Sequence, residues 1–525
     1  MSNHGLHWVD YLVIALYLGG ILYMSFALSR KQKSTETYFT ANRSIPAWAL
    51  AMSLMATIVS TVTFLAYPGN GYSGNWILLV QGLMVPVVLL AIVWFIVPMY
   101  RQIIRLSAYE YFEKRFGYFA RLYSSLAFLM AHFTKMGSAL YLLALPLTSM
   151  IGLDHPSAVY TVIVALGVMA VVYTLLGGIE AVIWTDCLQG SVLLGGGLIS
   201  AGILLFGSGQ GPAAVVQAAW ENHKISMGPY DLDFTRLTFW VMAINGIFYA
   251  LQKYGTDQTV VQRFLLAKSN RAAIKASIMG IALCVGVWTL FMFIGTLLWV
   301  YYRMPGHELP QGIAGDRVFP YFIMTQLPLG IKGLILTALI AAGMSIMDSD
   351  MNSLAAVGVE DYYRRIRTQA TDRQCLRMGR ILVAASGLAA TGVACLYVHL
   401  GGEAILGTVF ALYAIFSGGI AGLFALGFFT TRANRKGLAV GIGACVLFTA
   451  YALLTSTQFD LGGGEKRLIL DLGRYNFSQH KYMLGVYSHL VLFGFGYAAS
   501  FLFRPDRDVR PLTLYGWLEN QKKER

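Results

Sequence analysis

The sequence has little charge for its length. Asp, Glu, Lys and Arg make up 12% of its 525 residues, whereas 57% of the residues are hydrophobic. A water-soluble protein carries roughly 25% charged residues, and here the deficit extends along the whole chain. This composition excludes a single water-soluble core. It indicates a protein embedded in a lipid bilayer, where each crossing helix needs about 20 mostly apolar residues.

Cysteine is also scarce, and a signal peptide is absent. The first apolar run, residues 8–28, has no basic lead and no small-residue cleavage site, so it predicts a true membrane helix. No nucleophile–base pair or metal-ligand cluster is visible, which argues against an enzyme. The five cysteines show neither paired spacing nor a metal-binding pattern; they are Cys187, Cys284, Cys375, Cys395 and Cys445.

About thirteen apolar runs are long enough to cross the membrane. If the N-terminus lies outside and the C-terminus inside, the inner connections carry about three times as many Lys and Arg residues as the outer ones, as the positive-inside rule requires. The net charge of +13 then reflects topology anchors near anionic lipid, not a nucleic-acid surface. The runs lie at about 8–28, 46–67, 75–98, 122–149, 158–176, 187–206, 237–254, 276–302, 333–357, 381–399, 404–428, 438–454 and 482–503.

Four ionisable residues lie in or beside these runs, where charge is costly. Lys135 is near the middle of its run, too far from either end for its side chain to reach water easily, which favours a functional role over a structural ion pair. Lys253 is close enough to the cytoplasmic end to reach the interface. Asp186 opens a run, where it either caps a helix or binds a ligand.

The fourth residue, Asp348, belongs to a polar stripe in the run 333–357. Ser345, Asp348, Ser349 and Asn352 have i, i+3, i+4, i+7 spacing and share one helix face. Such a set of oxygens can bind a cation, because hard cations take several oxygen ligands. The alternative is close helix packing through small and polar side chains. The carboxylate favours the cation site, and Asp350 points away from it.

Two runs contain segments that predict broken helices. Residues 56–63 (ATIVSTVT) are rich in β-branched and hydroxyl side chains, which form a poor straight helix. The run 237–254 carries Asn245-Gly246 at its middle. In transporters, broken helices at the membrane midplane free backbone carbonyls to bind ions, and two such helices five apart are typical of inverted repeats.

Two further stretches resemble motifs of the solute:sodium symporter family. They are residues 177–189 (GGIEAVIWTDCLQ) and 257–269 (DQTVVQRFLLAKS), and the helix pattern agrees along nearly the whole chain. The resemblance implies an all-α membrane fold whose ten-helix core forms a five-plus-five inverted repeat with broken first and sixth core helices. It divides the chain into an extra N-terminal helix and loop (1–43), the core (44–428), two extra helices (429–503) and a cytoplasmic tail (504–525).

The resemblance also implies two sodium sites. The main site of the family uses backbone carbonyls of the first core helix and two consecutive serines of the eighth. Ile346 supplies no hydroxyl, so one ligand is missing, and Asp348 or a water is expected to compensate. The positions matching the main site are Ala56, Val59, Ala342, Ser345 and Ile346, and those matching the second site are Asp186, Ser345, Asp348 and Ser349.

Residues 64–76 (FLAYPGNGYSGNW) and 135–147 (KMGSALYLLALPL) are similar to the bacterial sialic acid branch of the family. In that branch an arginine holds the substrate carboxylate. Lysine keeps the charge but loses the two-pronged clamp, so the substrate is either a different acid or the same acid held by one contact. The substrate-binding positions implied by this resemblance are Thr57, Ser60, Thr63, Gln81 and Lys135.

Galactose-type members have a glutamate, a lysine and an asparagine where this chain has Gly82, Cys284 and Ala250, which disfavours a neutral hexose. The sequence therefore predicts a symporter of the inner membrane that couples one or two Na⁺ ions to a small organic anion, such as a sialic acid. Proton coupling in the same fold, or a different solute such as a neutral sugar, vitamin or amino acid, is the alternative. A sensor or channel is disfavoured, because no output domain and no pore ring of charge are visible.

Overall fold

The computed structural model describes residues 6–153, 155–207, 211–399, 418–460, 466–504 and 509–524. In these parts the chain is helical apart from one short antiparallel hairpin. The main elements are α1 (Trp8–Ser29), α2 (Thr35–Thr40), α3 (Ala47–Ile58), α4 (Thr61–Ser73), α5 (Leu79–Ile103), α6 (Tyr109–Phe116), α7 (Tyr118–Met150), α8 (Pro156–Phe206), α9 (Pro212–Glu221), α10 (Phe239–Thr256), α11 (Gln258–Leu266), α12 (Asn270–Tyr301), α13 (Gly315–Gln326), α14 (Ile331–Val357), α15 (Arg364–Ile366), α16 (Asp372–His399), α18 (Ile420–Phe429), α19 (Arg435–Ser456), β1 (Gln458–Asp460), β2 (Lys466–Leu468), α20 (Lys481–Ser500) and α21 (Leu514–Glu524).

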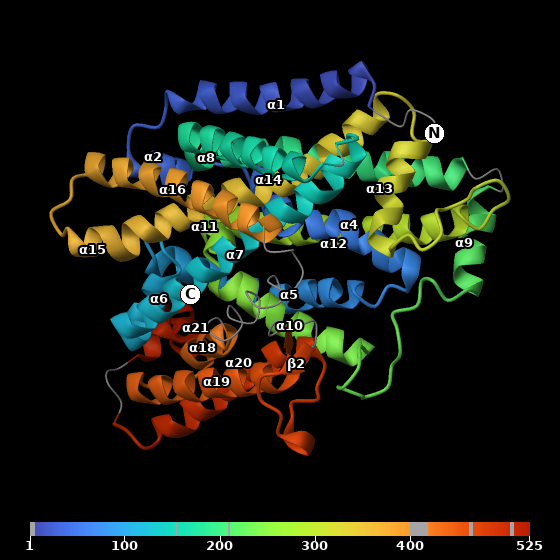
Figure 1. Cartoon of the computed structure of the whole chain (residues 1–525). Coiled ribbons are helices and arrows are strands. Elements are labelled where there is room, and N and C mark those ends of the chain that lie inside the picture. The colour runs from blue at the N-terminus through green and yellow to red at the C-terminus, as the bar shows by residue number, and fades with distance from the viewer. Residues whose placement is uncertain are drawn as a thin grey trace.

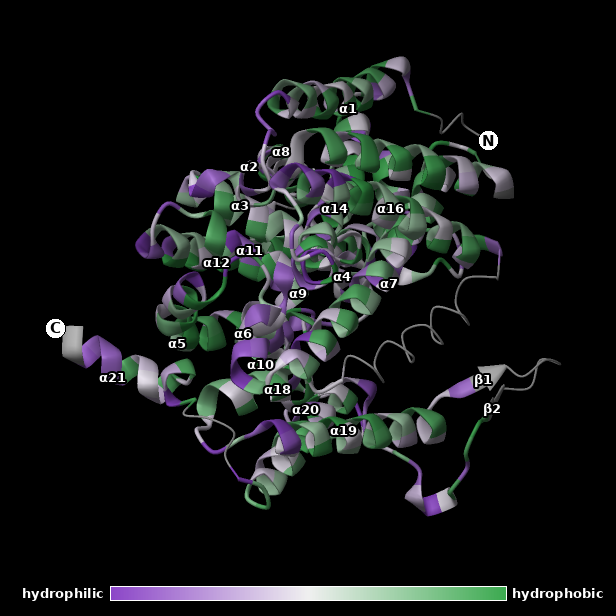
Figure 2. Cartoon of the chain, turned by 90° about the vertical axis from the view of Figure 1, so that its left-hand side faces the viewer, coloured by the Kyte–Doolittle hydropathy of each residue, from purple (hydrophilic) through white to green (hydrophobic). Residues whose placement is uncertain are grey.

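Several of these helices are built to cross a bilayer. Among the described residues, nine are long and apolar enough to span a membrane, and the bent pair α3–α4 passes the same test as one broken span. Figure 2 shows apolar residues covering most of α12 and α19, whereas polar residues concentrate in α6 and α21. The chain is therefore an all-helical, multi-pass membrane protein. Part of the predicted run 404–428 lies outside the described residues.

Helix α8 contains two of the predicted runs. It has 51 residues, which at 1.5 Å per residue is more than twice the roughly 30 Å of a hydrocarbon core. Gly178 interrupts it with a φ of 59° and a ψ of −161°, a conformation that glycine adopts without strain. A Cβ atom there would also lie 2.8 Å from the Tyr38 ring. The segment 177–186, predicted as a connection, is thus helical except at Gly178.

Helix α14 lies at the centre of the molecule. Every residue from 335 to 357 is buried, although this stretch includes Asp348 and Asp350. Figure 1 shows α14 between α1 at one edge and α19 and α20 at the opposite edge, with α4, α7 and α12 in the same central layer. The polar stripe of this helix therefore faces other helices and not lipid.

The first core helix is broken where the sequence predicts it. Helix α3 ends at Ile58, Val59 is extended (φ −76°, ψ 124°), and α4 begins at Thr61. The two halves meet at an angle of 64°. The last turn of α3 consequently has carbonyl groups without helical partners, which is the usual condition at a helix end.

The break predicted at Asn245-Gly246 is wrong. Helix α10 runs without interruption from Phe239 to Thr256, and the chain changes direction at Asp257, where α11 begins. Gly246 serves a different purpose, because a Cβ atom there would lie 2.7 Å from the carbonyl oxygen of Gln81. This glycine allows α10 to approach α5 closely, in the way small residues do in membrane helices.

Helices α4 and α12 approach each other closely at Gly295, and this contact leads to a stability prediction. A Cβ atom on Gly295 would lie 2.2 Å from the Pro68 carbonyl oxygen, whereas one on Gly286 of the same helix meets nothing within 4 Å. We expect Gly295→Ala to destabilise the protein by about 1–3 kcal/mol through overpacking, and Gly286→Ala to be neutral or stabilising. Thermal unfolding in detergent measures both. Equal behaviour of the two variants would contradict this close contact.

Candidate functional site

The break between α3 and α4 lies against the polar stripe of α14. Ser345 Oγ is 2.9 Å from the carbonyl oxygen of Ala56 and 3.3 Å from that of Ala342. All three residues are buried. Three oxygens from two helices thus meet at a buried point, where they can supply part of the oxygen ligand set of a hard cation such as Na⁺.

The other two positions of the predicted main sodium site contribute no side-chain oxygen. Val59 is buried at the extended residue of the break. The side chain of Ile346 lines the cavity described below. Asp348, expected to compensate for Ile346, forms its hydrogen bonds with α8 instead, because Asp348 Oδ2 accepts from Tyr173 at 2.8 Å and from Thr185 at 3.4 Å.

The second predicted sodium site also holds a buried arginine. Asp186 Oδ2 accepts a hydrogen bond from Ser53 at 2.6 Å and is 3.3 Å from Arg263 Nη2. The same nitrogen donates to Ser349 Oγ at 2.6 Å. Both side chains of the ion pair are completely buried. Asp186 lies within α8, so it does not cap a helix, and its carboxylate is shared by a serine and a guanidinium group.

Two carboxylate oxygens in this region retain free coordination capacity. Asp186 Oδ1 and Asp348 Oδ1 are buried and have no hydrogen-bond partner in the described part of the chain. Thr61 Oγ1, at the start of α4, is also buried without a hydrogen-bond partner among the described residues. Buried polar atoms are nearly always satisfied in proteins, so these oxygens fit a cation as their partner.

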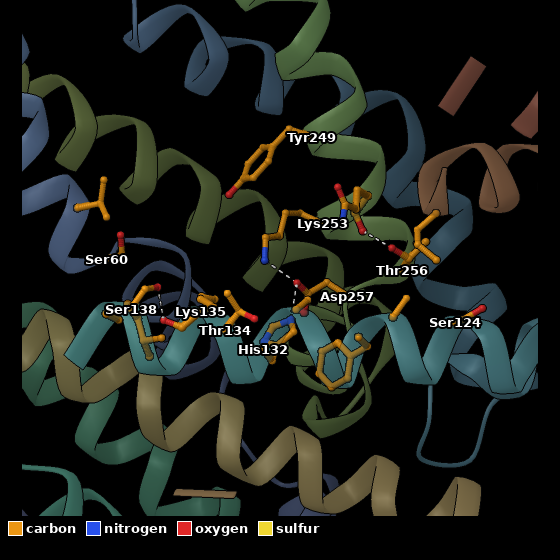
Figure 3. Close-up of a pocket in the computed structure, with 18 of the residues that line it drawn as sticks. Ser60, Ser124, His132, Thr134, Lys135, Ser138, Tyr249, Lys253, Thr256 and Asp257 are labelled. Carbon is orange, nitrogen blue, oxygen red and sulfur yellow. Dashed lines mark hydrogen bonds and ion pairs between the residues drawn. The ribbon is translucent and has the colours of Figure 1, made fainter. Parts of the chain in front are cut away.

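A cavity of about 380 Å³ opens next to the break and Ile346. It is lined by the start of α4, by α7 and by α10, and its polar lining includes Ser60, Lys135, Ser138, Lys253 and Asp257. Figure 3 shows Lys253 reaching from α10 to Asp257, with His132 of α7 on the other side of that carboxylate. A volume of this size suits a small organic solute.

Charged side chains connect the two walls of this cavity. Lys135 Nζ is 3.2 Å from both carboxylate oxygens of Asp350. Asp350 Oδ1 is 2.9 Å from His132 Nδ1, and His132 Nε2 is 3.5 Å from Asp257 Oδ2. That oxygen is also 2.5 Å from Lys253 Nζ. The five side chains form a continuous ion-pair network, called here the cavity network, from α7 through α14 to α10.

The structure separates the five predicted substrate-binding residues into two groups. Ser60 and Lys135 line the cavity, whereas Thr57, Thr63 and Gln81 are not part of its lining. The Thr57 hydroxyl donates to the Ser53 carbonyl at 2.8 Å and lies 3.0 Å from Ser349 Oγ. Thr63 Oγ1 accepts from the Ser60 amide at 3.3 Å as part of the cap of α4.

Sequence reasoning missed the partners of the charged residues. Lys253 was expected to reach the interface, and Asp350 only to point away from the polar stripe, yet both belong with His132 to the cavity network. Arg263 was counted only among the basic residues of the inner connections, but it is completely buried. Its presence in the motif 257–269, together with an intramembrane carboxylate at Asp186, was the available signal for this pair.

Comparison with known proteins identifies the family of the chain. The model of the sodium:solute symporter family matches residues 38–443. The sodium/sialic acid symporter NanT of Aliivibrio fischeri is 32% identical over 440 residues, covering 83% of this chain and 86% of the relative. SiaT of Proteus mirabilis, also a sodium/sialic acid symporter, is 30% identical over 445 residues, covering 84% and 89%.

A solved structure extends the similarity to the fold. A Na⁺-coupled sialic acid symporter in a substrate-bound, outward-open state superposes with a TM-score of 0.85 at 28% identity, covering 96% of this chain and all of that one. The family match covers well over half of the chain, and the helices that carry the oxygen cluster and the cavity lie within it. The chain belongs to the sodium:solute symporter family and is a sodium-coupled solute symporter, not an enzyme.

Proposed function

We propose that the protein imports a small organic anion, of the class of sialic acids and related acidic sugars, together with Na⁺. The observation that carries this proposal is Lys135, an ammonium group on α7 that lines the cavity beside the start of α4. The sodium/sialic acid relatives support the same class of cargo. Ser60 and Ser138 supply hydroxyl groups to the cavity that suit a polyhydroxylated ligand.

In this proposal, sodium binds between α14 and the broken helix and links the two. The ion takes the Ala56 and Ala342 carbonyls and the Ser345 hydroxyl, with Val59 and Ile346 at the edge of the site. A second ion uses Asp186, Ser345, Asp348 and Ser349, and it shares the Asp186 carboxylate with Arg263. Ion binding fixes the start of α4, and with it Ser60, so that the cavity is ordered for the substrate.

We further propose the membrane arrangement that the sequence predicts. The core, 44–428, contains two inverted five-helix repeats that rock against each other around the central site. About thirteen helices cross the inner membrane, counting α8 as two. The N-terminus lies outside and the C-terminus in the cytoplasm, as the positive-inside rule requires.

Uptake into proteoliposomes tests the proposed cargo and ion. Radiolabelled N-acetylneuraminate is offered under an inward Na⁺ gradient, with equimolar K⁺ as the control. We expect uptake only with Na⁺. Two sodium ions with one anion carry a net charge of +1, so an inside-negative potential should increase uptake, at about 2.3 kcal/mol per charge for each 100 mV.

Two results would change the proposal. Uptake driven by a pH gradient without Na⁺ would establish proton coupling, for which the buried Asp348 carboxylate is the available group. If Na⁺ drives no uptake of N-acetylneuraminate or of any acid in a panel of monocarboxylates and sugar acids, the anion proposal is wrong. A neutral sugar, a vitamin or an amino acid would then be tested as the cargo.

A further inference from the structure

The cavity network exposes its two lysines more than its two carboxylates. The side chain of Lys135 is 30% exposed and that of Lys253 19%, whereas Asp350 is completely buried and Asp257 is 7% exposed. Asp257 is also engaged elsewhere, because its Oδ1 accepts from the amide of Thr259 at 2.9 Å. The groups most accessible to a ligand are therefore the two ammonium groups, which come from opposite walls.

The network contains more positive than negative groups. Both ring nitrogens of His132 face carboxylate oxygens, at 2.9 and 3.5 Å. Nδ1 makes no hydrogen bond among the described residues, but two carboxylates within 4 Å of the ring favour its charged form electrostatically. Three cations then stand against two carboxylates. Asp257 is the only acidic side chain in the described lining of the cavity.

An excess charge inside a membrane protein is costly unless it is paired. One negative charge brought in by a ligand makes the network neutral, whereas a neutral ligand leaves the excess in place and a dianion reverses it. The charge count thus favours one ionic form of cargo. The lysines are on different helices, α7 and α10, so a carboxylate between them also draws the two walls together.

We infer that Lys253 is a second ligand for the substrate carboxylate, opposite Lys135, and that the cavity selects solutes with a single negative charge. This inference rests on the proposed function, because it specifies the cargo of the same cavity. Lys135 alone offers the carboxylate one point contact, and Lys253 supplies the second. Two point charges on separate helices here do the work of one two-pronged guanidinium group.

Substitution of Lys253 tests the inference in the full-length protein. Lys253→Gln removes the charge and leaves Asp257 paired with His132. We expect it to raise the apparent KM for N-acetylneuraminate roughly 10- to 100-fold, as expected for the loss of a charged hydrogen bond, and Lys253→Arg to restore most of the affinity. Lys275→Gln is the matched control, because Lys275 is exposed at the start of α12, and its KM should not change.

Ligand charge provides the second readout. Binding to the purified wild-type protein is measured by thermal shift for N-acetylneuraminate, its uncharged methyl ester and a panel of monocarboxylates, each compared with a dicarboxylate of similar size. We expect monoanions to bind at least tenfold more tightly than the ester or the dianions, and Lys253→Gln to remove most of this preference.

The outcomes separate this inference from the proposed function. If Lys253→Gln transports the acid with an unchanged KM, or if the ester binds as tightly as the acid, Lys253 is not a carboxylate ligand, even when sodium-driven uptake is intact. If no monoanion binds, both the inference and the anionic cargo are wrong. A Na⁺-dependent thermal shift in Lys253→Gln confirms that the variant is folded, so a lost response to the acid is then due to the cavity.

Discussion

Ser345→Ala should raise the sodium concentration for half-maximal uptake by at least tenfold and greatly reduce uptake at physiological sodium. The Ser345 hydroxyl lies 2.9 Å from the Ala56 carbonyl oxygen and is the only side-chain oxygen at the five positions of the proposed main site. The proposed second site shares this hydroxyl. Even residues that only support a metal ligand typically change metal affinity 10- to 100-fold, so removal of a direct ligand should cost no less.

Two further variants make this prediction specific. Ser277→Ala is the matched control, because Ser277 is also a buried helical serine, and within the described residues its hydroxyl donates only to the Ala273 carbonyl, at 2.9 Å. It should leave the sodium dependence unchanged. Ile346→Ser restores the missing hydroxyl and should lower the half-maximal sodium concentration. Unchanged sodium dependence in both Ser345→Ala and Ile346→Ser would place the ion elsewhere.

Asp186→Ala is expected to have the largest effect on stability, a loss of about 3–5 kcal/mol. Removing one member of a buried ion pair leaves the other charge without compensation. Here the remaining charge is Arg263, which is completely buried and would keep only hydroxyl and carbonyl acceptors. Chemical or thermal unfolding in detergent micelles, without sodium, measures the change separately from ion binding.

An exposed ion pair serves as the control for this prediction, and a double variant tests whether the two buried charges are coupled. Asp231 and Arg236 form an ion pair with side chains 40% and 59% exposed, so Asp231→Ala should change the stability far less than Asp186→Ala. Replacing both buried partners, as Asp186→Ala with Arg263→Met, should be less destabilising than Asp186→Ala alone, because no unpaired charge remains. A double variant that loses the sum of the two single effects would show that the pair is not coupled.

The sequence predicted features that depend on the residue pattern of a single helix. Features that depend on contacts between two helices were predicted less accurately. The stripe from Ser345 to Asn352 follows from helical spacing, and the structure buries it as expected. The break at Val59 follows from a β-branched run. Gly246, however, was predicted to break α10, because a glycine that permits close packing and one that interrupts a helix look the same in a sequence.

The cavity network shows the same limit. Lys135 was identified because a lysine in the middle of a membrane helix needs a partner, but nothing in the spacing of α7 identifies Asp350 as that partner. Lys253 and Asp257 lie near the end of α10, where charged residues are common, and their role depends on the position of His132 on another helix. Pairings between helices require the fold.

Equilibrium binding of radiolabelled Na⁺ to the purified protein tests the central claim most directly, because it needs no knowledge of the cargo. We predict saturable binding in the wild type and in Ser277→Ala, and binding reduced at least tenfold in affinity in Ser345→Ala. Saturable sodium binding of equal affinity in all three proteins would contradict a sodium site built from Ser345 and the broken helix.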